Sequence, residues 1–304
     1  MNTTPADDHE RATSDPATLA AFLALVAIAG GNAPAIRYIS CQSCELDPFW
    51  GAAMRFGLAS ALFAIVAVVM RVERPRGSAL LSAVLYGVLQ FGAGFGLIYW
   101  GLVRSPAGLG QVLVASVPLL TFGLALAHRQ ERFRLDGLLG AALAVGGIVV
   151  VFSNALDVGV PATSMLAILG GSVCWAEALV LVKRFPPVHP ATMNAIGMGI
   201  GAVVLLVLTV MFDESYVIPS SASTVWAQVY LVLAGSLGVF WLHIVVLRRW
   251  TASATSYELV LIPLVTLPVS AWLHDEKITV AFAAGSVLVL LGVYIGAIRR
   301  PVAR

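Results

Sequence analysis

Charged side chains are scarce in this chain. Only 11% of its 304 residues are Asp, Glu, Lys or Arg, whereas an ordinary soluble domain carries about 25%. So few charges cannot solvate the surface of a cytosolic enzyme of this length. The formal net charge of +2 argues against a nucleic-acid partner, because such binding needs a dense basic surface. Three cysteines are too few for a disulfide scaffold.

Apolar residues are abundant instead. They make up 59% of the chain, and the mean hydropathy is +0.91. A helix that crosses a bilayer needs about 20 largely apolar residues. The sequence therefore predicts an all-α membrane protein with ten transmembrane helices, at 17–36, 48–70, 78–102, 106–127, 136–153, 162–182, 190–212, 225–247, 252–273 and 279–298.

The flanking charges predict the orientation. The tail 1–16 carries Asp7, Asp8 and Glu10, which have the wrong sign for a signal peptide, so the first helix is expected to be retained. Of the 18 Lys and Arg residues, 14 lie in segments that share a side with the N-terminus and three lie in segments on the other side. We expect a multi-pass protein of a bacterial-type inner membrane with both termini in the cytoplasm.

The chain contains an internal repeat. A shift of 145 residues aligns 102–147 with 247–292 without a gap, and ten of the 46 positions are identical. Because each half, 17–153 and 162–298, holds five predicted spans, the second half enters the membrane from the opposite side. Inverted repeats are typical of transporters that work by alternating access. The identities that carry most weight are Arg104/Arg249, Pro118/Pro263, Thr121/Thr266, Glu131/Glu276, Gly140/Gly285 and Gly147/Gly292.

With these features the chain resembles the EamA family of the drug/metabolite transporter superfamily, over residues 17–298. The resemblance rests on two five-helix units, each with a proline in its fourth helix, an acidic residue after it and glycines in its last helix. Arg55 in the second helix and Trp175-Ala176 in the sixth also look like the family. The chain departs from the family in Gln130-Glu131 and Asp275-Glu276, where Gly-Glu is usual, and in Gly30-Gly31-Asn32, where Trp-Gly is common.

The resemblance implies a function but no particular substrate. It implies export or exchange of amino acids or other small metabolites, by proton coupling or simple exchange. Helices 4 and 9 are then expected to pivot near Pro118 and Pro263. The expected partners are a small-molecule substrate and the lipid bilayer, and the chain is expected to act as a monomer or homodimer.

Three titratable side chains fall at a similar depth within the spans. Glu177, Glu258 and His243 lie near the cytoplasmic ends of their helices by residue count. Ionisable groups inside a membrane are costly and often functional, so these three suit a proton-linked or cation-binding vestibule. The alternative is that both glutamates pair with Lys183, Arg248 or Arg249 at the interface.

Two polar residues near the outer side are further candidates. Arg55 could clamp a substrate carboxylate, but a structural bond to a backbone carbonyl or to Asp47 is the favoured interpretation. Asn32 aligns with Glu177 across the repeat and follows Gly30-Gly31, which either opens the helix toward a cavity or packs closely.

The remaining candidates are uncharged. Trp175 and Trp241 could line a cavity, but each lies about 200° around its helix from the nearby Glu177 or His243. Three more residues could line a pathway or form hydrogen bonds between helices: Gln90, Gln111 and Tyr257.

Other classes of protein fit less well. The sequence shows no catalytic pair or triad and no nucleotide-binding loop, so no enzyme activity or cofactor is expected. Cys41 and Cys44 are too few for a zinc site, and their spacing leaves open whether they are bonded. The lead prediction is a secondary transporter of small organic metabolites, most of all amino acids. The alternatives are a proton-coupled efflux antiporter for drugs or organic cations and, more remotely, a membrane protein without transport activity.

Overall fold

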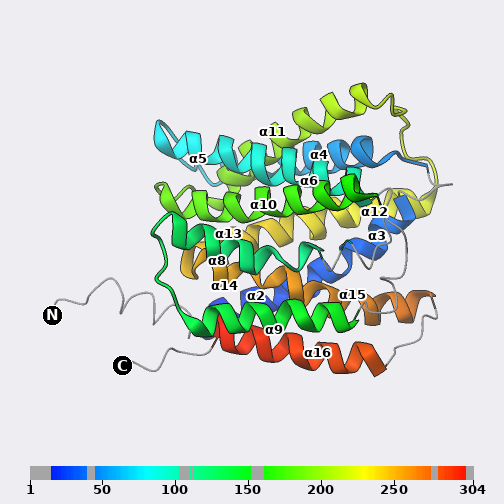
Figure 1. The fold of residues 1–304 in the computed structure, drawn as a ribbon. Coiled ribbons are helices and arrows are strands. Elements are labelled where there is room, and N and C mark those ends of the chain that lie inside the picture. The colour runs from blue at the N-terminus through cyan, green and yellow to red at the C-terminus, as the bar shows by residue number, and fades with distance from the viewer. Residues whose placement is uncertain are drawn as a thin grey trace.

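The computed structural model describes residues 15–39, 45–102, 110, 113–151, 161–274 and 280–298. Within these ranges the secondary structure is helical, and the helices pack side by side in one bundle (Figure 1). Cys41, Cys44, Gln111 and Glu276 lie outside the described residues. The helices are α2 (Pro16–Gly30), α3 (Asn32–Ile39), α4 (Pro48–Val69), α5 (Ser78–Tyr86), η1 (Gly87–Gly94), α6 (Phe95–Leu102), α8 (Val117–Ala127), α9 (Leu135–Val151), α10 (Ala162–Arg184), α11 (Pro190–Met211), α12 (Ala222–Val232), η3 (Leu233–Gly238), α13 (Val239–Arg249), α14 (Ala252–Ser256), α15 (Glu258–His274), α16 (Val280–Val293) and η4 (Tyr294–Ile298).

The bundle has the apolar exterior of a multi-pass membrane protein. Six helical stretches are long and apolar enough to cross a bilayer: Pro16–Ile36, Pro48–Val69, Ser78–Leu102, Ala162–Arg184, Pro190–Met211 and Ala222–Arg249. Four of the ten predicted spans correspond to shorter apolar helices: Val117–Ala127, Leu135–Val150, Ala252–Thr266 and Ala283–Gly296. Large apolar side chains on the outside, such as Val69 and Met211, are more than half exposed and suit contact with lipid.

Two of the longest helices contain a π-helical segment at matching places. The segment η1 interrupts the helix from Ser78 to Leu102, and η3 interrupts the helix from Ala222 to Arg249. A shift of η1 by 145 residues gives 232–239, which encloses η3. A π-helical turn widens the helix and weakens its regular hydrogen bonding, so side chains from elsewhere can bond to the backbone there.

The prolines of helices 4 and 9 occupy different environments. Pro263 lies inside α15, as predicted, whereas Pro118 lies in the first turn of α8. Pro118 is thus within the fourth helix as predicted, but a first-turn proline removes no helical hydrogen bond. Pro263 leaves the carbonyl four residues earlier without its helical partner, and a pivot at either proline stays a prediction.

Equivalent helices of the two repeats pack against each other. Helices α9 and α16 run side by side at the lower edge of Figure 1, in opposite directions. A Cβ atom on Gly147 would lie 2.7 Å from the Gly285 carbonyl oxygen, and one on Gly292 would lie 2.6 Å from that of Gly140. The shift of 145 residues converts Gly140 into Gly285 and Gly147 into Gly292. The two contacts are therefore equivalent, and exchanging the two repeats converts one contact into the other.

A second pair of equivalent helices packs in the same way. Helices α4 and α11 are in contact along their lengths. A Cβ atom on Gly57 would lie 3.9 Å from that of Ala202, which is the same position in the other repeat. A residue meets its own equivalent only where a two-fold axis passes between the two.

Candidate functional site

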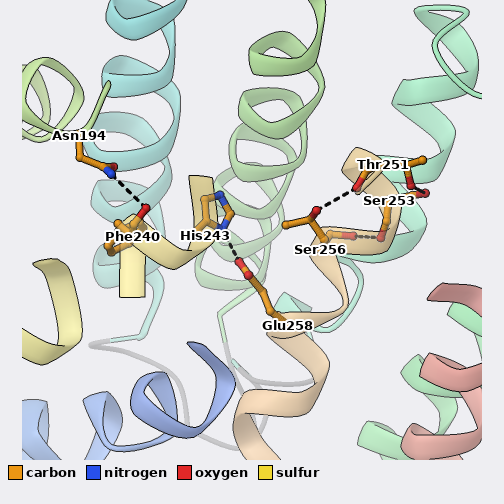
Figure 2. A network of polar contacts seen from close by, with 8 residues as sticks. Asn194, Phe240, His243, Thr251, Ser253, Ser256 and Glu258 are labelled. Atoms are coloured by element: carbon orange, nitrogen blue, oxygen red, sulfur yellow. Dashed lines mark hydrogen bonds and ion pairs between the residues drawn. The ribbon is translucent and has the colours of Figure 1, made fainter. Parts of the chain in front are cut away.

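A buried histidine–glutamate pair lies between α13 and α15. The Nδ1 atom of His243 is 2.7 Å from Oε1 of Glu258, and the two residues are 2% and 7% exposed (Figure 2). The helix is interrupted at Tyr257, between α14 and α15, so Glu258 is the first residue of α15.

Several buried polar atoms near this pair have no hydrogen-bond partner within the described part of the chain. They include Nε2 of His243, Oε2 of Glu258, the hydroxyl of Tyr86 and Oδ1 of Asn194. The ring of Tyr86 stacks 6.5 Å from that of His243, and Nδ2 of Asn194 donates to the Phe240 carbonyl one turn earlier in α13. A buried polar atom without a partner costs about 1–3 kcal/mol, and a polar ligand bonded to these atoms would remove that cost.

Arg55 and Asn32 bond to the π-helical segment of the other repeat. Nη2 of Arg55 donates to the Gly235 carbonyl at 2.8 Å, and its Nε donates to the Ser236 hydroxyl at 2.7 Å. Nδ2 of Asn32 donates to the same Gly235 carbonyl at 3.4 Å. The predicted bond from Arg55 to a carbonyl is confirmed. The alternative prediction, a bond from Arg55 to Asp47, is wrong among the described contacts. The Asp47 carboxylate instead accepts hydrogen bonds from the backbone amide and the hydroxyl of Ser215.

Trp175, in the second repeat, makes the corresponding contact with the π-helical segment η1 of the first repeat. Its Nε1 donates to the Gln90 carbonyl in η1 at 2.9 Å, and Gln90 is the equivalent of Gly235. Trp175 therefore bonds two helices, which is the role predicted only for the uncharged polar residues. The side-chain oxygen of Gln90 itself is buried without a partner among the described residues.

Four phenylalanines separate the Arg55 region from the His243–Glu258 pair. The guanidinium carbon of Arg55 lies 5.1 Å from the centre of the Phe56 ring, and the Phe240 ring lies 6.1 Å from that of His243. Phe91 and Phe95 complete the cluster, with ring centres 4.8–6.5 Å from those of Phe56 and Phe240. This apolar cluster therefore lies between the two groups of polar side chains.

Glu177 does not join the other two titratable groups. Its Oε1 lies 3.1 Å from Nε2 of His128, and both side chains are partly exposed. The expectation of one vestibule for Glu177, Glu258 and His243 is therefore wrong for Glu177. The three cations considered as partners of the glutamates bond to other groups in the described part of the chain: Arg249 to Asp15, Arg248 to the Val188 carbonyl and Lys183 to the Arg248 carbonyl.

The two remaining aromatic candidates pack between helices. Trp241 stacks on Phe63 with ring centres 6.4 Å apart and meets His189 edge to face. The Tyr257 hydroxyl donates to the Gly137 carbonyl at 3.4 Å, which is the helix-to-helix bond considered for it.

Carboxylates hold the helix ends of the opposite repeat at both faces of the bundle. At one face, Glu45 accepts from the backbone amides of Ser220 and Ser221 at the start of α12, and Glu214 accepts from Phe49 and Trp50 at the start of α4. These hydrogen bonds lower the pKa of Glu45 to about 2, whereas burial raises that of Glu214. We call this end of the bundle the Glu45 face.

The other end, the Asp15 face, has a similar contact. Glu131 accepts from the backbone amide and the hydroxyl of Ser253 at the start of α14, and Arg249 pairs with Asp15 at 2.7 Å. The sequence pointed to Glu131 through the repeat, but it did not single out Glu45, Glu214, Tyr86 or Asn194. Polar residues beside helix starts or within apolar spans are the signal that could have found them.

The described residues offer no metal site. No three His, Cys, Asp or Glu side chains within these ranges lie close enough together to hold a metal ion.

Comparisons with known proteins identify the family. The model of the EamA-like transporter family matches residues 17–153 and 162–297. The inner membrane transporter YedA of Escherichia coli K12 is 30% identical over 260 residues, with 82% of this chain and 83% of YedA covered; its own function is uncharacterized. A "probable terminal-alkyne amino-acid exporter" of Streptantibioticus cattleyicolor is 29% identical, with 76% and 78% covered. A crystal structure shares the fold with a TM-score of 0.79 at 16% identity, covering 93% of this chain and 96% of the other. This chain therefore belongs to the EamA-like transporter family.

Proposed function

We propose that this protein is a secondary transporter that exports or exchanges small organic metabolites, amino acids foremost, by alternating access. The observation that carries the proposal is the reciprocal contact between α9 and α16, in which Gly140 meets Gly292 and Gly147 meets Gly285. Equivalent helices that cross in opposite directions are expected when two repeats span a membrane with inverted topology. We extend this to ten spans, with the shorter helices completing five in each repeat.

The proposed motion exchanges the contacts at the two faces. Opening the Glu45 face requires Glu45 and Glu214 to leave the helix starts that they cap, while the Glu131 contact holds the Asp15 face closed. The reverse opens the Asp15 face. Because the caps bind repeat to repeat, each can break as the repeats rotate without unfolding either one. The distribution of Lys and Arg favours the cytoplasm for the Asp15 face and for both termini, in an inner membrane.

The His243–Glu258 pair is the proposed proton site. In this proposal a coupled proton binds between the Glu258 carboxylate and the His243 imidazole, which lie 2.7 Å apart in a buried position. Ser256 and the start of α15 lie beside the pair (Figure 2), so a change in its charge acts directly on the break at Tyr257. This pair also supports the second candidate, proton-coupled efflux of organic cations.

Counterflow tests the transport proposal. Proteoliposomes are loaded with a mixture of unlabelled amino acids, and labelled amino acids are added outside one at a time. We expect at least one label to accumulate transiently above its equilibrium level, which requires a carrier that exchanges solutes. Accumulation of none of them, together with dye movement under a pH gradient, would favour the cation antiporter instead.

A matched pair of variants tests the proton site. We expect Glu258→Gln to retain counterflow but to lose uptake driven by a pH gradient, because the amide of glutamine cannot bind the coupled proton. Glu177→Gln is the control, since Glu177 pairs with His128 at a partly exposed site, and it is expected to keep both activities. Full gradient-driven uptake by Glu258→Gln would refute the role of the pair.

A further inference from the structure

A second polar site lies beyond the phenylalanine cluster, on the side of the Glu45 face. It is a cavity of about 190 Å³ between α3, α4, α6 and α12. Its polar lining side chains are Arg55, Tyr99 and Gln228, and its other walls include Ile36 and Leu231. This volume is large enough for several water molecules, so the cavity suits a small solute.

Arg55 brings a positive charge to this cavity that no described carboxylate balances. The residue is 3% exposed, and within the described ranges its neighbours are neutral: the Gly235 carbonyl, the Ser236 hydroxyl and the Tyr99 hydroxyl. The bonds to Gly235 and Ser236 use two of the five N–H donors of a guanidinium. A buried cation that lacks an anion is costly, and an anionic ligand at the remaining donors would offset that cost.

Gln228 adds an acceptor in the same cavity. It is 6% exposed, and its Nε2 donates to the Gly51 carbonyl at 3.4 Å. Its Oε1 is buried without a partner among the described residues. A ligand that satisfies both side chains therefore needs two groups: an anion for Arg55 and a hydrogen-bond donor for Gln228.

We propose that this cavity binds a small carboxylic acid whose adjacent amino or hydroxyl group donates to Gln228, with the carboxylate at Arg55. This inference rests on the proposed transport function and specifies its substrate as an α-amino or α-hydroxy acid. An organic monocation is excluded from this cavity. A second positive charge about 5 Å from the guanidinium would weaken binding by more than about 100-fold at an effective dielectric constant of 20. The apolar walls favour a small aliphatic side chain on the ligand.

Four compounds with the same three- or four-atom framework test the proposal by calorimetry on the purified protein. Alanine and lactate carry both groups, propionate lacks the donor, and isopropylamine lacks the carboxylate. We expect alanine and lactate to bind about 3- to 10-fold more tightly than propionate, the value of one hydrogen bond. Isopropylamine is expected to show no binding at the same concentrations. Equal binding of propionate and isopropylamine, or binding by none of the four, overturns the proposal.

Gln228→Leu localises the effect to this cavity. Arg55 is left unchanged because it also holds η3 in place. We expect Gln228→Leu to reduce the affinities for alanine and lactate to that for propionate and to leave propionate unchanged. Gln130→Leu is the control, since Gln130 bonds to the Val180 carbonyl on the other side of the bundle. An unaltered preference for alanine over propionate in Gln228→Leu overturns the site.

The binding-site proposal and the transport proposal can be refuted independently of each other. Counterflow of alanine combined with an unaltered preference in Gln228→Leu would retain the transport proposal and remove this site. Binding with the expected preferences but without counterflow would retain the site and refute transport.

Discussion

Gly147→Ala is predicted to separate the two repeats where they cross. A Cβ atom at Gly147 would lie 2.7 Å from each of three atoms of α16: the Gly285 carbonyl oxygen, the Val289 amide nitrogen and the Val289 Cγ2. Since ordinary contacts to a Cβ atom begin near 3.4 Å, the helices would have to move apart by about 0.7 Å. Two of the three atoms belong to the backbone, so a change of rotamer cannot relieve the contact.

Such overpacking costs about 1–3 kcal/mol in the free energy of unfolding. The assay is reversible unfolding of the purified protein in mixed micelles, followed by tryptophan fluorescence. Gly146→Ala is the matched control in the same helix, because no atom lies within 4 Å of a Cβ atom there. We expect the control to be neutral or stabilised by about 0.5–1 kcal/mol through the better helix propensity of alanine. Equal effects of the two variants would refute the argument from close crossing.

Three other changes probe the contacts that hold the repeats together. Glu45→Gln should remove a pH-dependent contribution to the free energy of unfolding. Because hydrogen bonding lowers the pKa of Glu45 from 4.5 to about 2, the wild type has this contribution above about pH 4.5 and loses it as the pH falls toward 2. In denaturation measured across that pH window, the free energy of unfolding should therefore change less with pH for the variant than for the wild type. Trp175→Phe should cost about 1–3 kcal/mol by leaving the Gln90 carbonyl without its donor, measured against Trp226→Phe at a 72% exposed position; equal costs would contradict the inter-helix role. Glu131→Gln should cost about 0.5–2 kcal/mol in the same unfolding assay, since it weakens the cap on α14, and no change would show that the cap contributes nothing.

The six long apolar helices and the two repeats could be predicted from the sequence because both depend on local information. Hydropathy is a property of consecutive residues, and the 145-residue shift compares types of residue without knowing their contacts. The helix geometry that placed Trp175 and Glu177 on different sides was also sound, since one bonds to Gln90 and the other to His128. What failed was the inference that groups at one depth share one site. Residue count gives the height along a helix but not its rotation relative to its neighbours.

The interior contacts required the packed structure. His243 and Glu258 are 15 residues apart on separate helices, and their pairing depends on the break at Tyr257. The two π-helical segments likewise leave no clear mark in the local sequence, because contacts from Arg55 and Trp175 accompany the altered backbone. Neither the four-phenylalanine cluster nor the Arg55 cavity could be assembled from hydropathy alone.

Labelling of a cysteine at Ala52 tests alternating access most directly. Ala52 lines the Arg55 cavity and is 4% exposed. In a background in which Cys41, Cys44 and Cys174 are replaced by serine, Ala52→Cys is treated with an impermeant maleimide in right-side-out and in inverted vesicles, with and without alanine. Ser220→Cys at the Glu45 face is the control and is expected to react from one side only. The account predicts that the cysteine at position 52 reacts from both sides and that alanine changes the ratio of the two rates. Reaction from a single side under every condition would contradict alternating access at this site.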